Sequence, residues 1–170
     1  MSEERKKKIK EKIISPQEKI LAEFGVAKIY SGFWIFLGFL ILIISVIVSL
    51  FYISDFWLAI LFGLALIFYG FYLRLAYFYF ITDKRLVYYY QFLHTQLISV
   101  DYQKITDLSV KENFLEKIFF GSGNLAINTA GGPKEEIIFS HIDNPHFIKR
   151  KINEIISSQK QNIKERFQNT

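Results

Sequence analysis

Residues that could carry acid–base or metal chemistry are scattered along the sequence. The histidines are His94, His141 and His146, and none is paired with another histidine or a carboxylate at the spacing of zinc sites. The chain has no cysteine, which excludes a disulfide framework, a thiol nucleophile and a cysteine-based metal site. Most aspartates fall at expected strand ends and turns, where their side chains usually bond to nearby backbone. We therefore expect no catalytic residue, no metal and no cofactor, and a binding protein rather than an enzyme.

Basic and aromatic side chains are the better candidates, and they indicate binding. Lys84 and Arg85 occupy an expected hairpin turn and are candidate contacts for lipid or an acidic partner. A solvated turn is the alternative. The other candidate contacts for lipid or a partner are Lys6, Lys7, Lys8, Tyr88, Tyr89 and Tyr90. Because neighbouring residues of a strand point to opposite faces, Tyr89 should face away from Tyr88 and Tyr90. One of these two sets is expected in the core and the other exposed or in contact with a partner.

Two long apolar segments organise the elements that must position these residues. Residues 29–54 and 56–73 carry no charged side chain. About 20 apolar residues in a helix cross a bilayer core of roughly 30 Å. We therefore expect a transmembrane hairpin over residues 29–79, with spans at 29–53 and 56–76 and a turn at 52–55. Trp34, Trp57 and Arg74 are the expected membrane-interface anchors. One span plus a buried core helix is the alternative.

The charge distribution predicts the orientation of this hairpin. Every Lys and Arg lies before residue 29 or after residue 73. The positive-inside rule then places both termini in the cytoplasm and predicts a multi-pass protein of the cell membrane. A net charge of +5 at the inner leaflet favours anionic phospholipid as a partner, and no nucleic-acid-binding motif is present. The first apolar run begins too late and is too long for a cleaved signal peptide, so we interpret it as a retained signal anchor.

Residues 1–28 are predicted to be a basic cytoplasmic segment. The lysine-rich start is typical of a solvated tail, but a membrane-surface helix is also open because the isoleucines of residues 9–14 share one helical side. Ser15, Pro16 and Glu18 form a helix-start signal. The apolar alternation of residues 19–24 instead favours a strand, and the sequence alone leaves both alternatives open.

The sequence pattern of residues 77–157 is typical of a small β-rich domain. Strands are expected at 77–82, 85–92, 95–101, 104–112, 124–129 and 136–141, with a short helix at 113–119. Strand spacing near ten residues favours an antiparallel sheet or small barrel. A helix beginning near Pro145 should dock on it through an apolar stripe that fades from Ser157. Residues 158–170 are expected to be a polar, frayed tail.

Four segments of this domain carry a resemblance to a known family. They are YFITDKRLVY at 79–88, ITDLSV at 105–110, FLEKIFFGSG at 114–123 and LAINTAGG at 125–132. In this order, after an apolar hairpin, they resemble the bacterial pleckstrin-homology (PH) domain family of membrane proteins over about residues 18–156. The resemblance implies an α+β membrane protein, with a transmembrane helical hairpin plus a PH-like antiparallel sheet or half-barrel and a C-terminal amphipathic helix. It supplies no catalytic residues.

The resemblance also sharpens the expectations for the first residues and for function. A PH sheet has one more strand than the six expected after the hairpin, so residues 18–24 could supply it and pack on the domain. We expect a membrane-anchored binding or scaffold module that docks a protein partner or forms a homo-oligomer at the cytoplasmic face of the lipid bilayer. The alternatives are sensing or binding of anionic lipid, and an accessory subunit of a membrane complex.

Overall fold

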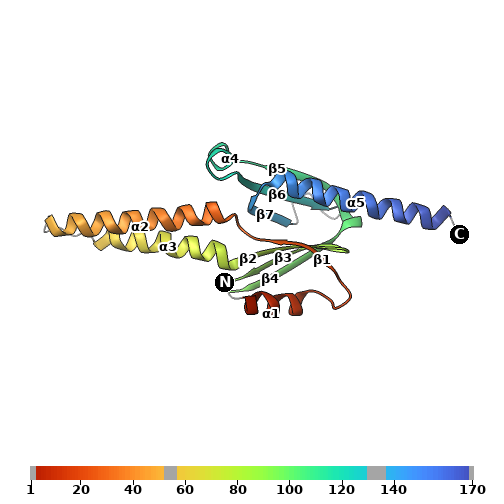
Figure 1. Ribbon diagram of the computed structural model, residues 1–170, viewed down its shortest axis with the longest axis horizontal. Helices are drawn as coiled ribbons and strands as arrows, with labels where there is room; N and C mark the ends of the chain where they lie inside the picture. Colours follow the sequence, from red (N-terminus) through yellow and green to blue (C-terminus); the bar gives the residue numbers. More distant parts are fainter. Residues whose placement is uncertain (1–2, 52–56, 130–136, 169–170) are drawn as a thin grey trace.

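The computed structural model describes residues 3–51, 57–129 and 137–168, and it joins a long helical hairpin to a two-sheet domain (Figure 1). The helices and strands follow in the order α1 (Glu3–Ile13), β1 (Ile20–Phe24), α2 (Lys28–Phe51), α3 (Trp57–Ala76), β2 (Tyr77–Thr82), β3 (Arg85–Gln91), β4 (Thr95–Asp101), a 3₁₀ turn (Tyr102–Lys104), β5 (Ile105–Lys111), α4 (Phe114–Phe120), β6 (Ser122–Thr129), β7 (Ile137–Asp143) and α5 (Pro145–Gln168).

The domain core lies between two antiparallel sheets. Among the described residues, one sheet has the order β1-β2-β3-β4 and the other the order β5-β6-β7. Fully buried side chains from both sheets meet in between, including Tyr79, Leu86, Leu125 and Phe139. Helix α5 closes this core through its apolar stripe, in which Ile152 is completely buried. The predicted α+β fold with PH-like antiparallel sheets is confirmed.

Strand β1 shows that the hairpin is an insertion in the sequence of the domain, between two paired strands. β1 pairs antiparallel with β2, with Phe24 opposite Tyr79 and Glu23 opposite Phe80. The strand alternative for residues 19–24 is therefore correct, and the helix start suggested by Ser15 and Pro16 is not formed. The hairpin leaves the sheet after β1 and returns to it directly at β2.

Helix α1 corrects both expectations for the N-terminal residues. It is neither a solvated tail nor a helix on a membrane surface, because Ile9 and Ile13 are buried against the outer face of the four-stranded sheet. That face carries Phe78, Phe80, Val87 and Tyr89. Burying one such side chain contributes about 1.5–3 kcal/mol. The apolar outer face of the sheet is the physical reason that this lysine-rich segment folds onto the domain.

The hairpin helices pack tightly on each other and expose apolar side chains elsewhere. An 18-residue window of α2 has a mean hydropathy of 2.9 with 11% of its residues buried, and the corresponding values for α3 are 2.0 and 17%. By length and composition, both helices could cross a membrane. So little burial does not fit a core helix of this domain. The predicted turn at 52–55 lies outside the described residues.

Helix α5 extends beyond its apolar stripe. The helix continues to Gln168, whereas the fading stripe predicted a frayed tail from Ser157. Residues 157–168 contain no Gly or Pro and are rich in Gln, Lys, Glu and Arg, which all tolerate a solvated helix. In Figure 1 this part of α5 runs away from the hairpin.

Glycines set the spacing of the hairpin, and this gives a first prediction. A Cβ atom at Gly38 would lie 2.7 Å from the Gly63 carbonyl oxygen and 2.9 Å from the Ile67 nitrogen, which are backbone atoms of α3 that cannot turn aside. Gly32 on the same helix has nothing within 4 Å of such an atom. We expect Gly38→Leu to destabilise the full chain in detergent by about 1–3 kcal/mol or more through overpacking. The melting temperature measures this effect. Gly32→Leu is the matched control, and an equal loss in both variants would contradict the close helix contact.

Candidate binding cleft at the base of the hairpin

A cleft of about 420 Å³ lies where the hairpin joins the domain. We call it the hairpin cleft; its lining residues are Ile9, Lys10, Glu23, Phe24, Gly25, Val26, Lys28, Arg74, Tyr77, Phe78 and Phe80. They come from α1, from β1 and the segment after it, from the domain ends of α2 and α3, and from β2. Residues far apart in the sequence therefore build one cleft.

The charges of the hairpin cleft are predominantly positive. Lys10, Lys28 and Arg74 supply three positive charges and Glu23 one negative charge, which leaves a formal charge of +2. Lys10 Nζ lies 2.5 Å from Glu23 Oε2 and is partly neutralised by it. Lys28 and Arg74 are exposed, and neither forms an ion pair or side-chain hydrogen bond with another described residue. Two cations are thus free to bind an anion.

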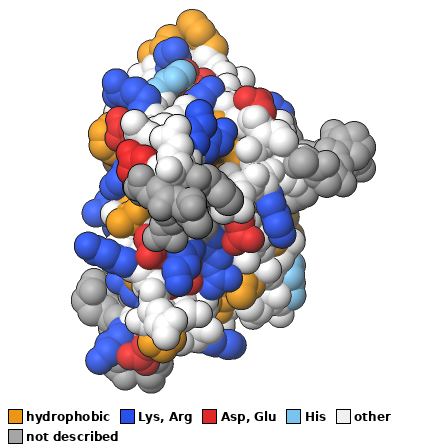
Figure 2. All heavy atoms as spheres, turned by 90° about the vertical axis from the view of Figure 1, so that its right-hand side faces the viewer, with side chains coloured by type: hydrophobic (Ala, Val, Ile, Leu, Met, Phe, Trp, Pro, Cys, Tyr) orange, Lys and Arg blue, Asp and Glu red, His pale blue; other side chains and the backbone are white. Residues whose placement is uncertain are grey.

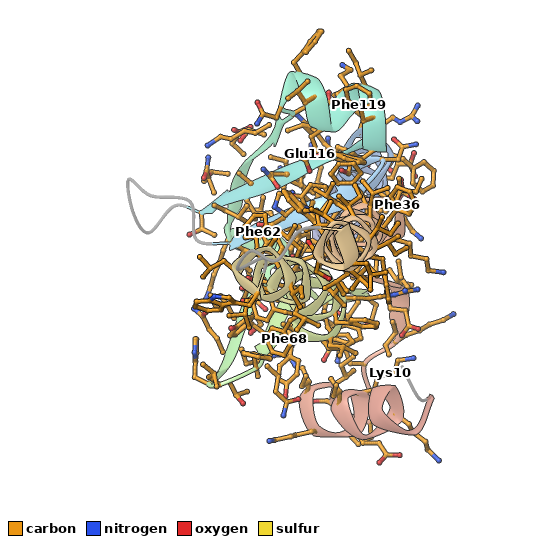
Figure 3. The ribbon with its side chains drawn as sticks, turned by 90° about the vertical axis from the view of Figure 1, so that its left-hand side faces the viewer. Lys10, Phe36, Phe62, Phe68, Glu116 and Phe119 are labelled. Carbon is orange, nitrogen blue, oxygen red and sulfur yellow. The ribbon has the colours of Figure 1, made fainter. Side chains whose placement is uncertain are left out.

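Local structure explains why these cations converge. Lys28 is the first residue of α2, and Arg74 lies two residues before the end of α3. The pairing of β1 with β2 brings these helix ends together. Gly25 is required at the junction, because a Cβ there would lie 2.9 Å from the Tyr77 carbonyl oxygen. Lys10 reaches the cleft because α1 is fixed through Ile9 and Ile13. Figure 1 shows α1 under the four-stranded sheet near the end of α3, and Figure 3, viewed along the hairpin toward the domain, shows Lys10 on this helix.

The arrangement suits binding of an anionic group with an apolar attachment. Lys and Arg side chains are the usual partners of phosphate oxygens. Apolar side chains of Ile9, Phe24, Val26 and Phe78 form the adjoining wall. Among the described residues, no group of three or more His, Asp or Glu side chains could hold a metal ion.

The two predicted turn residues are separated from this cleft and have different surroundings. Lys84 is exposed. Arg85 is held by Glu18, with both the Nε–Oε1 and the Nη2–Oε2 distances at 3.0 Å. The Thr82 hydroxyl also donates to Glu18 Oε1 at 2.6 Å. Arg85 therefore ties the segment before β1 to the β2–β3 turn and is not available to a ligand in this arrangement.

The predicted aromatic contacts are largely internal. Tyr89 is buried beneath α1, and Tyr90 is buried with its hydroxyl 3.1 Å from that of Tyr72. Tyr88 is half-buried and packs against the core. The expectation that one tyrosine set would be exposed is wrong, because α1 covers the face that would otherwise be free.

The remaining predicted residues lie on α1 and the hairpin. Lys7 on α1 is exposed, while the side chains of Lys6 and Lys8 are outside the described part of the chain. Trp34 packs against Tyr69 near the domain end of the hairpin. Trp57 begins α3 at the far end and is 55% exposed. Arg74 alone of the predicted anchors lines the hairpin cleft.

Sequence reasoning did not select Lys10 and Lys28 as a site. For Lys28 a signal was present, because it is the last charge before the apolar run and its counterpart after the second run is Arg74. Nothing in the sequence indicates that Lys10 approaches them, since this depends on α1 docking against strands about 70 residues away.

Comparison with protein-family models identifies the family of the chain. The family model described as "Bacterial PH domain" matches residues 26–156, a range that includes the hairpin and the strands β2 to β7. The chain therefore belongs to the bacterial PH domain family, as its motifs predict. Among solved structures, it is similar to a DUF1696 family protein with a pleckstrin-homology domain from Shewanella loihica PV-4. That protein is 11% identical, with 92% of this chain and 98% of that chain covered and a TM-score of 0.47. No curated protein matches the chain significantly.

The Glu18–Arg85 pair predicts a pH-dependent stability. Burial raises the pKa of Glu18, but hydrogen bonds from Arg85 and Thr82 outweigh it and hold the pKa below its ordinary value. The pair therefore stabilises the fold above the unfolded-state pKa, and this stabilisation is lost as the pH falls through the folded-state pKa. At pH 7 we expect Glu18→Gln to cost about 1.5–3 kcal/mol, the usual range for hydrogen bonds to charged groups.

The measurement is the melting temperature of the full chain in detergent across the acidic range. The gap between wild type and Glu18→Gln should be widest at neutral pH and close at the acid end. Asp107→Asn is the control, because Asp107 is exposed and has no ion pair among the described residues. A gap that stays constant with pH would contradict the assigned role of Glu18.

Proposed function

We propose that this chain is a multi-pass protein of the cytoplasmic membrane, with both termini inside, that binds an anionic phospholipid headgroup in the hairpin cleft. The chain acts as a binding module and not as an enzyme. The single observation that carries the proposal is that Lys28 and Arg74, at the domain ends of the two apolar helices, line one cleft.

Two properties of the hairpin support its place in a membrane. Its outward surface is apolar along its length, with Phe36, Phe62 and Phe68 each about 60% exposed. In water such a surface would be costly, at about 25 cal/mol per Å². Its cations lie only at the domain end, as the positive-inside rule requires of a cytoplasmic domain.

The position of the cleft favours a lipid headgroup over a soluble anion. A cation at the end of a membrane-spanning helix lies at the depth of lipid phosphates, which attract it by about 1 kcal/mol per charge. The opposite face of the domain differs, because Figure 2 shows Lys and Arg side chains there interspersed with Asp and Glu. The hairpin end therefore combines free positive charge with access to lipid.

Protein docking or self-association is the second candidate function. β4 is paired with β3 on one side, and no strand covers its other edge among the described residues. Leu97 on this strand is 51% exposed. An open strand edge can accept a strand from a partner or from a second copy. Crosslinking in native membranes that recovered only the monomer would count against this alternative.

Lipid titration of the full chain tests the headgroup proposal. The protein is held in neutral detergent, and its melting temperature is followed while short-chain phosphatidylglycerol or phosphatidylcholine is added. A ligand that binds only the folded state raises the melting temperature as its concentration passes its Kd. We expect phosphatidylglycerol to stabilise the wild type more than phosphatidylcholine does. The double variant Lys28→Gln/Arg74→Gln should bind phosphatidylglycerol about thirtyfold more weakly, since each cation beside anionic lipid contributes about 1 kcal/mol.

Lys84→Gln is the matched control, because it removes an exposed lysine away from the cleft. It should respond to lipid as the wild type does. Both cleft cations are exposed, so the lipid-free melting temperature of the double variant should stay near that of the wild type. An equal response to the two lipids, or an equal response of wild type and double variant, would overturn the proposal.

A further inference from the structure

Helix α4 exposes most of its apolar side chains and buries a carboxylate, whereas its other charge, Lys117, is exposed and pairs with Glu112 at 3.0 Å. Phe114, Leu115, Ile118 and Phe119 are 74%, 62%, 59% and 68% exposed, and we call these four residues the α4 apolar face. Glu116, on the same helix, is only 7% exposed. A surface helix in water normally buries its apolar side and exposes its charges. Such an inversion marks a surface that is covered by something apolar.

Buried polar contacts hold α4 in this orientation. Glu116 Oε1 accepts a hydrogen bond from the Ser122 hydroxyl at 3.1 Å and lies 2.7 Å from His141 Nδ1. The His141 ring in turn stacks on Tyr30 of α2, with ring centroids 4.1 Å apart and an interplanar angle of 9°. Gly121, with φ of +58°, ends the helix immediately afterwards. The α4 apolar face is therefore built outward and is tied to the first turn of the hairpin.

The same contacts set the level of α4 along the hairpin. The Phe120 ring, at the end of α4, lies 5.4 Å from that of Tyr30 and 5.1 Å from that of Phe33. Both partners belong to the first two turns of α2. Figure 1 shows α4 at the hairpin end of the domain, and Figure 3 shows Phe119 and Lys10 on opposite sides of the hairpin helices.

The β3–β4 turn forms a second apolar projection, which packs against the domain end of α3. Phe92 and Leu93, in the β3–β4 turn, are 43% and 91% exposed. The Phe92 ring contacts Phe68 at 6.1 Å and Tyr72 at 4.8 Å. Rings also join the two hairpin helices here, since Tyr69 contacts Trp34 of α2. The β3–β4 turn and α4 therefore flank the hairpin at matching depth.

We propose that the α4 apolar face and the β3–β4 turn embed in the interfacial region of the leaflet from which the hairpin enters the membrane. The inference rests on the proposed membrane insertion of the hairpin. It assigns the occupant by continuity, because each projection contacts an exposed ring of the hairpin: Phe120 of α4 contacts Phe33, and Phe92 contacts Phe68. An amphipathic helix at a membrane surface buries its apolar side about 5–10 Å deep. With the hairpin, these projections fix the domain in one tilt and hold the hairpin cleft against the headgroups.

Site-specific fluorescence in vesicles tests this proposal on the full chain. The chain has no cysteine, so single cysteines can be labelled without background. Variants Phe119→Cys and Leu93→Cys carry an environment-sensitive dye and are reconstituted in phosphatidylcholine vesicles containing a lipid with a nitroxide near the start of its acyl chain. We expect the dye at both positions to show blue-shifted emission and a loss of emission from the nitroxide.

Two matched positions make the outcomes distinguishable. Phe36→Cys labels the outer surface of α2, and Lys104→Cys labels an exposed position before β5. Quenching at Phe36 with a response at Phe119 no larger than that at Lys104 would overturn this inference and leave the membrane hairpin standing. Absence of quenching at Phe36 as well would overturn both. Disulfide crosslinking between copies at Phe119 without quenching would assign the α4 apolar face to a second copy and overturn the lipid proposal.

Discussion

The pairing of β1 with β2 is the interaction on which the rest of the structure depends. The hairpin is inserted between these two strands, so their antiparallel register brings the start of α2 and the end of α3 together. Close contact at Gly38 and Gly63 continues this juxtaposition along the helices. A sheet is rigid compared with a loop, so the domain and the hairpin meet in a defined geometry and not through a flexible tether.

This geometry gathers cations and exposed apolar side chains at the hairpin end of the domain. Three cations surround one cleft, and two apolar projections flank the helices at one level. Buried groups elsewhere support these features, since Ile9 and Ile13 fix α1 and Glu116 fixes α4. If the hairpin crosses the membrane as proposed, three kinds of lipid contact lie at one end of the molecule: spanning helices, interfacial apolar residues and cations at headgroup depth.

Sequence patterns predicted the parts of the fold that depend on local periodicity. The charge-free runs predicted the two helices, and alternation predicted the strands after the hairpin. For residues 19–24 the local pattern left helix and strand open, and the pairing with β2 decides for the strand. Features that depend on distant partners were not predictable. The lysine-rich start was expected in water because its partners, Phe78 and Phe80, lie in a strand about 70 residues further on. The exposed phenylalanines of α4 cannot be distinguished from core residues by type, and only the inward position of Glu116 reveals their direction. Arg74 was expected as an anchor, whereas its convergence with Lys28 required the strand pairing.

Topology mapping in cells tests the central claim most directly, because the cleft and the interfacial contacts both require the hairpin to cross the membrane. Single cysteines at Asp55 and Lys104 are exposed to a membrane-impermeant maleimide in spheroplasts and in inverted vesicles. The account predicts labelling at residue 55 only from outside and at residue 104 only from the cytoplasmic side. Labelling of both positions from the same side, or recovery of the protein in the supernatant without detergent, would contradict it.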